Sequence, residues 1–589
     1  MTWTQVYDPY GIWWLSTLVA AIPIIVLLGL VAVARVRPHL AAAAGAASAL
    51  AVACLAFHMP WTLGLASFLF GAAFGLLRIA WIVVTAVFLY DVSVKTGQFE
   101  IMKQSIAGIT PDRRLQVLLV AFCFGALIEG AAGFGAPVAI AGAFMIGLGF
   151  KPFHAAVLNL IANTAPVAWG AIGTPVHTLA AVSGLPESDL SATVGRILPI
   201  TAVIVPFWLV RSFVGWAETF EVLPAILVVG VSFASAQFFW SNKIDSNLVD
   251  IAGALTSLAA TVLFLRLWQP KRIWTFARDS AQDRRPAAQT GDATEARSEI
   301  DRAVYGAANV GGAAGTATNA QAPRHSKAQI ARAWMPFLLL SGFVLIWGLP
   351  GMKTTMNRLT MPAFDQGGWS FPLLDRAVTR ASPVVSQPSP ESAKFEFNWL
   401  SATGTGCLLA GITAGLLLGL RPRDLLQVFW GTLKRMRAAV LAISFMLGLG
   451  YITRYSGMDA VLGLAFTRTG ILFPFFGTFL GWLGVALTGS DTSSNALFGG
   501  LQRITAEQLR LDPILMCAAN SAGGVMGKMV DVQSIVVATA ATNQVGNEGS
   551  ILRYLIWHSI ALASIVGLIV LIYSYVFPGA VPHGLTLAK

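Results

Sequence analysis

Long stretches of apolar residues recur along the chain, and the first of them, residues 11–34, contains no charged side chain. A helix needs about 20 such residues to cross the hydrocarbon core of a bilayer. Because the stretches are continuous and do not alternate with polar residues, they predict helices and not barrel strands. We predict an all-α polytopic membrane protein with about 12 transmembrane helices. The predicted spans are 11–34, 40–57, 61–90, 153–180, 193–211, 219–238, 247–266, 333–350, 396–419, 438–453, 513–541 and 551–576.

Two further apolar stretches, residues 115–149 and 471–501, are interrupted by glycine and polar residues. Irregular backbone at membrane depth is tolerated only where it is buried in protein or lines a water-filled cavity. We therefore predict that both stretches are re-entrant hairpins, which enter the membrane and return to the same side.

Basic residues in short loops predict the orientation, because such loops stay in the cytoplasm. Arg37 follows the first span, and several basic residues lie in 91–114. Both loops can be inside only if residues 61–90 cross once, as one long helix that is not split at Arg78. The N-terminus is then outside. The chain then divides into an N-terminal membrane half (1–267), a polar cytoplasmic linker (268–332) and a C-terminal membrane half (333–589). The C-terminal half contains an extracellular segment, 351–394.

The two halves share short patterns at equal spacing. Each hairpin has two glycines five residues apart, Gly125 and Gly130 in the first and Gly484 and Gly489 in the second. Downstream, each half has an asparagine seven residues before a glycine. These are Asn163 and Gly170 in the first half and Asn520 and Gly527 in the second. Such short matches also arise by chance in sequence rich in alanine and glycine. Paired interruptions at corresponding positions are nevertheless typical of transporters built from inverted repeats. We therefore predict two inverted-repeat halves.

Composition and charge support a membrane protein. Hydrophobic residues make up 56% of the chain and charged residues 11%, whereas soluble proteins carry about 25% charged residues. The net charge of +11 suits basic loops that face acidic lipid, so the lipid bilayer is an expected partner and nucleic acid is not. The four cysteines lack the spacing of disulfides or metal ligands. The sequence carries no signal for an oligomeric state.

The first hairpin contains the segment EGAAGFGAP, residues 129–137. An ionisable group at membrane depth is costly, so Glu129 is a candidate for carrying a coupled proton. Gly133 and Gly135 would let the backbone approach a substrate closely. The alternative is tight helix packing through small residues, with Glu129 at a hairpin end that faces water.

The second hairpin contains the segment TGSDTSSN, residues 488–495, whose many polar groups would be unsatisfied in lipid. We predict that it binds substrate and that Asp491 is a second candidate for the coupled proton. The candidate substrate-binding residues are Ser490, Thr492, Ser493 and Asn495. The alternative is an extracellular turn in which Ser490 or Asp491 caps a helix.

Two further segments contain polar residues beside helix breakers. Prolines and glycines in 162–177 should break that span in mid-membrane, which would place Asn163 and Thr164 near an unwound site. His177 could titrate near neutral pH and is a third proton-coupling candidate, although a lone histidine at a helix end is more often structural. In 520–534 the candidates for substrate binding are Asn520, Ser521 and Lys528, while Lys528 could instead pair with Asp531 or extend to the interface.

The chain contains no Walker loop, nucleotide fingerprint, HExxH motif or nucleophile elbow. We therefore expect no cofactor, no metal and no direct use of ATP, and coupling to an ion gradient is the natural alternative. A polytopic membrane enzyme would need a cluster of ligands or catalytic groups near one interface. The seven histidines are scattered along the chain and form no such cluster in the sequence.

Six parts of the chain together resemble the L-lactate permease family of proton-coupled transporters. They are YDVSVKTGQFE (90–100), FCFGALIEGAAGFGAPVAI through GLGFKP (122–152), NTAPVAWGAIGTPV (163–176), FEFNWLSATGTG (395–406), GWLGVALTGSDTSSNALF (481–498) and GKMVDVQSI (527–535). The resemblance implies a multi-pass protein of a bacterial inner membrane that imports lactate and other 2-hydroxy monocarboxylates such as glycolate. One departure is Asp531-Val532, which stands where a Ser-Pro pair is expected and adds a carboxylate near Lys528.

These observations predict a proton-coupled lactate symporter that works by alternating access around a site between the two hairpins. The substrate carboxylate would contact hairpin amides, hydroxyls and Lys528. Asn163 and Asn520 would hold its hydroxyl group or the broken helices, and Glu129 or Asp491 would take the proton. A sodium-coupled carrier of small carboxylates is the alternative, because the oxygens of SDTSSN could bind Na⁺.

Overall fold

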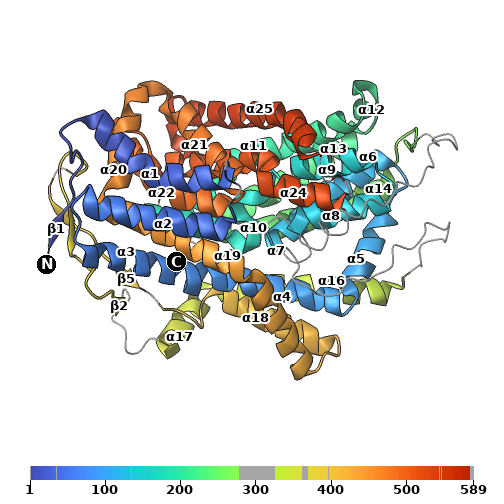
Figure 1. Cartoon of the computed structure of the whole chain (residues 1–589). Helices are drawn as coiled ribbons and strands as arrows, with labels where there is room; N and C mark the ends of the chain where they lie inside the picture. Colours follow the sequence, from blue (N-terminus) through green and yellow to red (C-terminus); the bar gives the residue numbers. More distant parts are fainter. Residues whose placement is uncertain are drawn as a thin grey trace.

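The computed structural model describes residues 2–32, 34, 36–133, 136–276, 325–360, 369–385, 387–395, 397–542, 544 and 547–583. Most of the predicted linker and part of the predicted extracellular segment, residues 277–324 and 361–368, lie outside this set. The molecule is elongated, and most of its helices run along the long axis (Figure 1). One end carries the strands of the described residues and is called here the strand end. The other carries residues 268–276 and is called the linker end.

The N-terminal half contains both full-length and broken helices. They are α1 (Trp13–Ala32), α2 (Pro38–Leu55), α3 (Trp61–Phe74), the π-helix η1 (Gly75–Ala80), α4 (Trp81–Lys95), α5 (Gln98–Ala107), α6 (Arg113–Gln116), the π-helix η2 (Val117–Phe124), α7 (Gly125–Ala131), α8 (Ala136–Gly147), α9 (Pro152–Ala162), η3 (Val167–Trp169), α10 (Gly170–Ser183), α11 (Glu187–Phe213), α12 (Trp216–Glu221), α13 (Leu223–Lys243) and α14 (Val249–Leu267).

The C-terminal half repeats much of this order. Its helices are α16 (Lys327–Gly348), α17 (Pro350–Thr360), α18 (Thr403–Leu417), α19 (Pro422–Ser456), α20 (Met458–Phe466), η5 (Thr467–Leu472), α21 (Phe473–Thr488), α22 (Asp491–Leu509), α23 (Pro513–Gly527), η6 (Lys528–Val530), α24 (Val532–Ala541), α25 (Glu548–Tyr575) and η7 (Pro578–Ala580). Proline in the first turn begins α2, α9, α19 and α23, where its missing N–H costs nothing.

Short strands tie the N-terminus to the segment that follows α17. β1 (Trp3–Thr4) pairs in parallel with β3 (Val378–Arg380), which pairs with β4 (Ser389–Pro390). β2 (Trp369–Ser370) pairs with β5 (Lys394–Phe395). The N-terminus and the segment 351–394 therefore lie at the same end of the molecule, the relation that the predicted topology requires.

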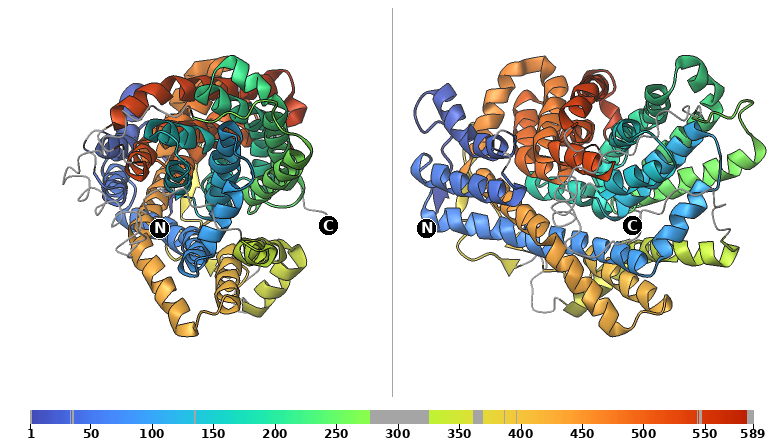
Figure 2. Two further views of the ribbon diagram at one scale, coloured as in Figure 1. Left: turned by 90° about the vertical axis from the view of Figure 1, so that its right-hand side faces the viewer. Right: turned by 45° about the vertical axis from the view of Figure 1, so that its right-hand side comes forward.

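Packing between the halves is reciprocal. The helix formed by α3, η1 and α4 and the helix α19 are each 35 residues long, and they cross each other. α2 packs on α19 of the other half, and α18 packs on α4 of the other half. In Figure 1, and in the right-hand view of Figure 2, α3, α4, α16 and α18 lie along the lower side of the molecule, and the hairpin helices α21 and α22 lie above them. Two halves related by a pseudo-two-fold axis give this exchange of partners.

The two predicted hairpins begin at opposite ends of the molecule. In the first, the backbone N–H of Arg113 donates to the carbonyl of Trp274, and its guanidinium lies over the rings of Phe150 and Phe276. Both ends of 113–150 are therefore at the linker end. In the second, residues 470–471 and 509–512 line one pocket, and Gln508 donates to Pro383 at the strand end. Each segment thus returns to the end from which it starts, as inverted halves require. Their re-entry into a bilayer stays a prediction.

The number of membrane-long helices is close to the predicted 12, but two of them, Arg113–Ala131 and Met458–Thr488, extend into the stretches predicted as hairpins, and several boundaries were wrong. Among the described residues, 11 helices are long and apolar enough to span a membrane, or 12 if the bent pair α9–α10 counts as one span. Residues 61–95 form one continuous helix, as the single crossing at 61–90 requires. The predicted span 438–453 is only the last part of α19, because Lys434, Arg435 and Arg437 mask the helix in the hydropathy pattern. Arg435 forms an ion pair with Asp91 of α4.

Other predicted spans were wrong in extent. Span 513–541 is two helices, α23 and α24, because the chain turns at η6 and Asp531. Span 219–238 begins in the separate short helix α12, and span 396–419 shortens to α18. Span 193–211 extends to α11, whose polar first turn hides the helix start. The C-terminal half begins with α16 at Lys327, before the predicted residue 333.

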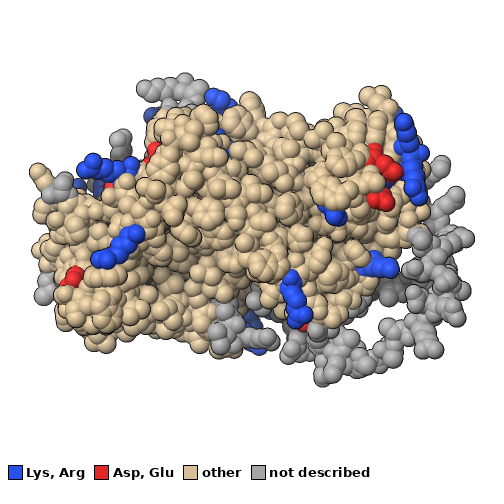
Figure 3. Space-filling model, turned by 90° about the horizontal axis from the view of Figure 1, so that it is seen from above, with Lys and Arg blue, Asp and Glu red and all other residues tan. Residues whose placement is uncertain are grey.

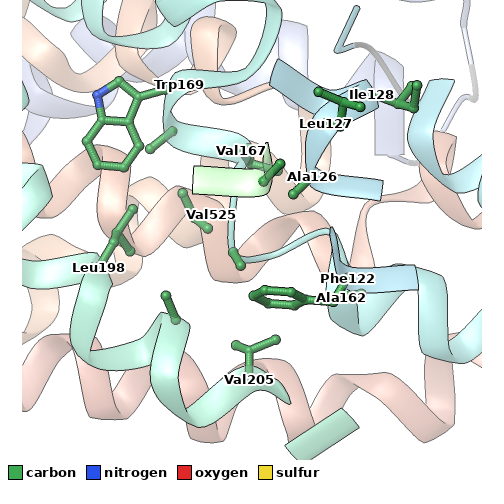
Figure 4. Packing of buried hydrophobic residues seen from close by; sticks show 14 of the residues in the cluster. Phe122, Ala126, Leu127, Ile128, Ala162, Val167, Trp169, Leu198, Val205 and Val525 are labelled. Atoms are coloured by element: carbon green, nitrogen blue, oxygen red, sulfur yellow. The ribbon is translucent and has the colours of Figure 1, made fainter. Parts of the chain in front are cut away.

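The surface of the molecule fits a membrane environment. Charged side chains are few on the face seen from above and lie mostly towards its two ends (Figure 3). Inside, apolar residues of η2, α7, α9, η3, α11 and α23 pack together, among them Phe122, Val167, Trp169 and Val525 (Figure 4). This packing joins η2, α7 and η3 of the N-terminal half to α23 of the C-terminal half.

Helices α21 and α23 approach each other closely through glycine. A Cβ atom on Gly481 would overlap the carbonyl oxygen of Asn520, which belongs to the backbone and cannot rotate away. We predict that Gly481→Ala destabilises the protein by about 1–3 kcal/mol, the usual cost of overpacking. Gly342→Ala is the matched control, because Gly342 is helical with open space around it, and the change should be neutral or stabilising by up to about 1 kcal/mol. Thermal unfolding in detergent compares the two, and equal melting temperatures would contradict the prediction.

Candidate functional site

The tips of the two hairpins meet near the middle of the molecule. Gly133 at the first tip and Gly489 at the second have φ of +62° and +74°, a conformation that favours glycine. A Cβ on Gly133 would lie 2.9 Å from Cβ of Ala171, and one on Gly489 would lie 2.8 Å from Oδ1 of Asp531. Each tip therefore abuts the break in the broken helix of its own half.

The break between α9 and α10 has an unusual backbone. The two helices meet at a bend of 65°, and Ala171, Ile172 and Gly173 are all left-handed, with φ of 46°, 58° and 73°. A left-handed residue other than glycine costs about 1–3 kcal/mol and persists only where its surroundings enforce it. The predicted break in 162–177 is therefore confirmed, and its strain is concentrated beside the first hairpin tip.

A small cavity of about 30 Å³ lies between the hairpin tips and the breaks. It is lined by residues of both halves: Glu129, Gly133, Val167, Gly170, Ala171, Thr174, Pro175, Gly489, Ser490, Asp491, Thr492 and Lys528. Its three ionisable residues, Glu129, Asp491 and Lys528, are at most 4% exposed. A volume of this size has room for a few water molecules at most, so the site must widen to admit a small molecule. The lining mixes backbone, hydroxyl and charged groups.

Lys528 supplies the positive charge of the cavity. It lies in η6, at the break between α23 and α24, and its Nζ donates to the carbonyl of Gly489 at 2.5 Å. The same Nζ lies 3.2 Å from Oδ2 of Asp531. Asp531 also caps α24, since its Oδ1 accepts from the backbone N–H of Ser534 at 2.7 Å. Asp531, which stands where a Ser-Pro pair was expected, therefore bonds both Lys528 and the backbone of α24. The alternative of a Lys528–Asp531 ion pair is confirmed.

Asp491 begins α22 at the cavity. Its Oδ2 accepts from the hydroxyl of Ser521 at 2.6 Å and from Nδ2 of Asn495 at 3.3 Å. Its Oδ1 has no hydrogen-bond partner within the described part of the chain. Ser490 is the N-cap of α22 and accepts from the backbone N–H of Ser493 at 3.3 Å. The predicted capping role of Ser490 is correct, but the cap lies inside the protein and not at an extracellular turn.

Amide side chains join the second hairpin to its neighbours. Asn495 Nδ2 donates to the carbonyl of Pro175 in α10 at 3.1 Å, and its Oδ1 accepts from Nδ2 of Asn520 in α23 at 2.9 Å. Gln502 donates to Oδ1 of Asn520 at 3.2 Å. Across the cavity, the hydroxyls of Thr492 and Thr174 lie 3.5 Å apart. Asn495 and Asn520 therefore support the cavity wall, while Thr492 faces the cavity.

Glu129 lies on α7 at the opposite wall of the cavity. Its side chain packs against the backbone of Gly170, where a Cβ would collide with Oε1. Its Oε2 and the amide of Asn163, which is 4% exposed, lie near enough to interact electrostatically, but among the described residues neither makes a hydrogen bond of ordinary geometry. The alternative of a Glu129 that faces water at a hairpin end is therefore wrong, because the surrounding helices cover the residue.

The remaining predicted residues lie around the cavity or outside the described set. The Thr164 hydroxyl donates to the carbonyl of Ile161 in its own helix at 2.7 Å. Ser493 is one residue beyond the cavity lining on α22. Gly135 lies outside the described residues. His177 is not in the cavity lining and instead contacts Oδ1 of Asn247 at 3.0 Å and Oε2 of Glu187 at 2.9 Å, towards the strand end.

Two arginines of the C-terminal half hold the strand end of α10. Arg454 donates to the carbonyls of Ala181 and Val182 at 3.2 and 3.3 Å, and Arg503 donates to that of Ser183 at 2.6 Å. These carbonyls are unpaired at a helix C-terminus and attract cations. The broken helix α10 thus faces the cavity with one end and is fixed to the other half at its other end.

Known proteins are similar to this chain over almost its whole length. The sequence model of the L-lactate permease family matches residues 16–577. "Glycolate permease GlcA" of Escherichia coli (strain K12) is 45% identical over 587 residues, 98% of this chain and 99% of that protein. "L-lactate permease" of the same strain is 43% identical over 588 residues, 98% and 100% respectively. "L-lactate permease" of Bacillus subtilis (strain 168) is 40% identical over 601 residues, 99% and 100%.

Among solved structures, the one titled "Structure and Function of Neisseria gonorrhoeae MtrF Illuminates a Class of Antimetabolite Efflux Pumps" aligns with 86% of this chain and 83% of that chain. The identity is 10% and the TM-score 0.40, a likeness too weak to support an argument.

Proposed function

The chain belongs to the L-lactate permease family, and we propose from this premise that it imports lactate and related 2-hydroxy monocarboxylates such as glycolate, in symport with protons. Relatives named for glycolate and for L-lactate are almost equally similar to it, at 45% and 43% identity. The proposal therefore includes both substrates. The protein is a multi-pass protein of a bacterial inner membrane, and the relatives are permeases, which gives the membrane-enzyme alternative no support.

The charge balance of the cavity is the observation that supports proton coupling. One cation, Lys528, faces or adjoins three carboxyl groups, those of Glu129, Asp491 and Asp531. With all three ionised, the site would carry a net charge of −2 before a carboxylate substrate entered it. Like charges at this depth repel strongly because the surroundings screen them little. Protons on Glu129 and Asp491 would remove that repulsion, so substrate and protons would bind together.

The same residues suggest how the substrate is held. The first backbone N–H groups of α22 have no partner inside the helix and lie at its positive end, beside Ser490 and Thr492. A carboxylate bound there would also come within reach of Lys528. The amide of Asn163 lies beside Glu129, behind the cavity lining, and would bond the 2-hydroxyl group of the substrate once the cavity widens.

Alternating access is supported by how the halves are joined. Each hairpin starts at a different end of the molecule, and both tips reach one cavity. Arg454 and Arg503 fix α10 at the strand end, so these bonds would have to open to admit substrate from that side. Closing one end while the other opens is the expected motion of paired repeats around a fixed site.

Uptake by purified protein in liposomes tests the proposal. We expect labelled lactate and labelled glycolate each to accumulate when the outside is made acid, and each to be displaced by the other. A sodium gradient at constant pH should give no accumulation. Accumulation that follows sodium and ignores pH would replace the proposal by the sodium-coupled alternative, which the oxygens of Ser490, Asp491 and Thr492 could support. If neither unlabelled lactate nor unlabelled glycolate reduces the uptake of either labelled substrate, the assigned substrate class is refuted.

A further inference from the structure

Asp250 is a buried carboxylate that takes no part in the cavity described above. It lies in the first turn of α14, is 0% exposed, and packs beside the first hairpin. Within the described part of the chain, neither of its oxygens has a hydrogen-bond partner. Buried carboxylates are normally paired or hydrogen-bonded, so this one requires an explanation.

Helix capping does not explain Asp250. An acidic residue in a first turn favours the helix dipole, but neither oxygen of Asp250 accepts a backbone N–H, and the turn before α14 is held by Asp245. Oδ1 of Asp245 accepts from the backbone N–H groups of Asn247 and Leu248 at 2.8 and 3.2 Å. Asp250 therefore does not cap α14. Without a partner, its ionised form is strongly unfavourable at this depth, and a bound proton removes the penalty.

Asp250 lies next to Glu129 of the cavity wall. A Cβ on Gly130 would be 2.9 Å from Cβ of Asp250, and the two carboxyl groups interact electrostatically. Among the described residues, Oε2 of Glu129 also makes no hydrogen bond of ordinary geometry. Two buried carboxyl groups that repel each other are stable together only when at least one of them holds a proton.

We propose that Asp250 is a second proton-binding residue of the transport cycle, which exchanges its proton with Glu129. In the exchange, an O–H bond on one carboxyl group breaks as one forms on the other, so the total charge of the pair is unchanged. The inference rests on the proposed function and extends it, because it places the coupled proton on a residue that is not in the cavity lining.

Polar groups lie between the start of α14, where Asp250 is, and the strand end of the molecule. Asn247 precedes it by three residues and bonds Nε2 of His177 at 3.0 Å, and Nδ1 of His177 lies 2.9 Å from Oε2 of Glu187. The Glu187 side chain is 40% exposed, so it can meet water. Lys353 of α17 acts electrostatically on both His177 and Glu187, and Glu129 acts on Asp250 from α7. These contacts form a polar chain from the exposed Glu187 through His177 to Asn247, which ends three residues before Asp250.

The variant Asp250→Asn separates a proton role from a structural one. Asparagine has the shape of a protonated aspartate but cannot release a proton. In liposomes, exchange of labelled for unlabelled lactate at equal pH needs binding and the conformational change but no net proton movement, and it should stay close to wild type. Accumulation driven by an acid outside should be lost, and the lactate-dependent alkalinisation of the medium should be lost with it.

Asp459→Asn is the matched control, because Asp459 is another buried carboxyl group, 7% exposed, at the strand end of the C-terminal half. It should keep both exchange and accumulation. If Asp250→Asn accumulates lactate like wild type, the role of Asp250 is refuted while the proposed function stands. If it loses exchange together with accumulation, its role is structural and the inference is also refuted. If wild type itself responds to sodium and not to pH, both proposals fall.

Discussion

Lys528→Met is expected to abolish lactate binding. Lys528 is the cation of the cavity, it is 4% exposed, and no other lysine or arginine lines the cavity among the described residues. Breaking a buried charge pair by removing one partner costs about 3–5 kcal/mol, which corresponds to a loss of more than about 100-fold in affinity if that cost falls on substrate binding. Lactate-dependent thermal stabilisation of the protein in detergent, measured beside uptake in liposomes, gives the result.

A structural role for Lys528 must be separated from substrate binding, because Asp531 is its neighbour at 3.2 Å and is fully buried. Lys528→Met alone leaves Asp531 without a counter-ion and should lower the melting temperature. The double variant Lys528→Met, Asp531→Asn removes both charges and should restore the melting temperature but not the response to lactate. A double variant that binds and transports lactate would show that Lys528 only balances Asp531, and the proposed contact with the substrate would be refuted.

The sequence predicts the broken elements of this fold well, because their physical causes are local. Glycine at Gly133 and Gly489, where φ is positive, marks both hairpin tips. Proline and glycine around 163–175 mark the break in the span between α9 and α10. Polar residues such as Asp491 and Lys528 stand out because apolar neighbours surround them. Each signal is contained in a few residues, and the cavity forms where these segments meet.

Features that depend on distant partners could not be predicted in this way. The start of α19 is hidden by basic residues that are tolerated because Arg435 pairs with Asp91 of the other half. The pairing of β1 with β3 joins segments more than 370 residues apart. Asp250 has the sequence context of an ordinary residue in the first turn of a helix, and only the packing of α14 against α7 places it beside Glu129.

Roles were harder to predict than positions, because a polar side chain can bond to the protein or to a substrate. Ser490 was a candidate for both, and in the structure its hydroxyl accepts from Ser493 as a helix cap. Asn495 and Asn520 bond each other, whereas the amide of Asn163 makes no hydrogen bond of ordinary geometry among the described residues. Geometry therefore separates residues that build the cavity wall from those with capacity to bind, a distinction that residue type alone does not make.

Removing the charge of a carboxyl group of the cavity, Glu129 or Asp491, is expected to uncouple lactate transport from the proton gradient. In Glu129→Gln and Asp491→Asn an amide replaces a carboxyl group and keeps the shape of its protonated form. Each variant should therefore still bind and exchange lactate, but the site it removes can no longer carry a proton. We expect pH-driven accumulation to fall at least about tenfold in the variant that lacks the coupling residue, the change produced by about 1.4 kcal/mol in the coupled equilibrium.

The pH dependence identifies which carboxyl group carries the proton. Lactate exchange by wild type should weaken as the pH rises, because an ionised Glu129 or Asp491 repels the substrate carboxylate. The variant that lacks the coupling group should show a flat profile, while the other should still respond to pH. Asp491→Asn has the smaller risk of a structural effect, since an amide oxygen can accept the bonds that Ser521 and Asn495 now donate. If both variants keep the slope and the accumulation of wild type, neither group carries the proton, and the charge balance of the cavity has another cause.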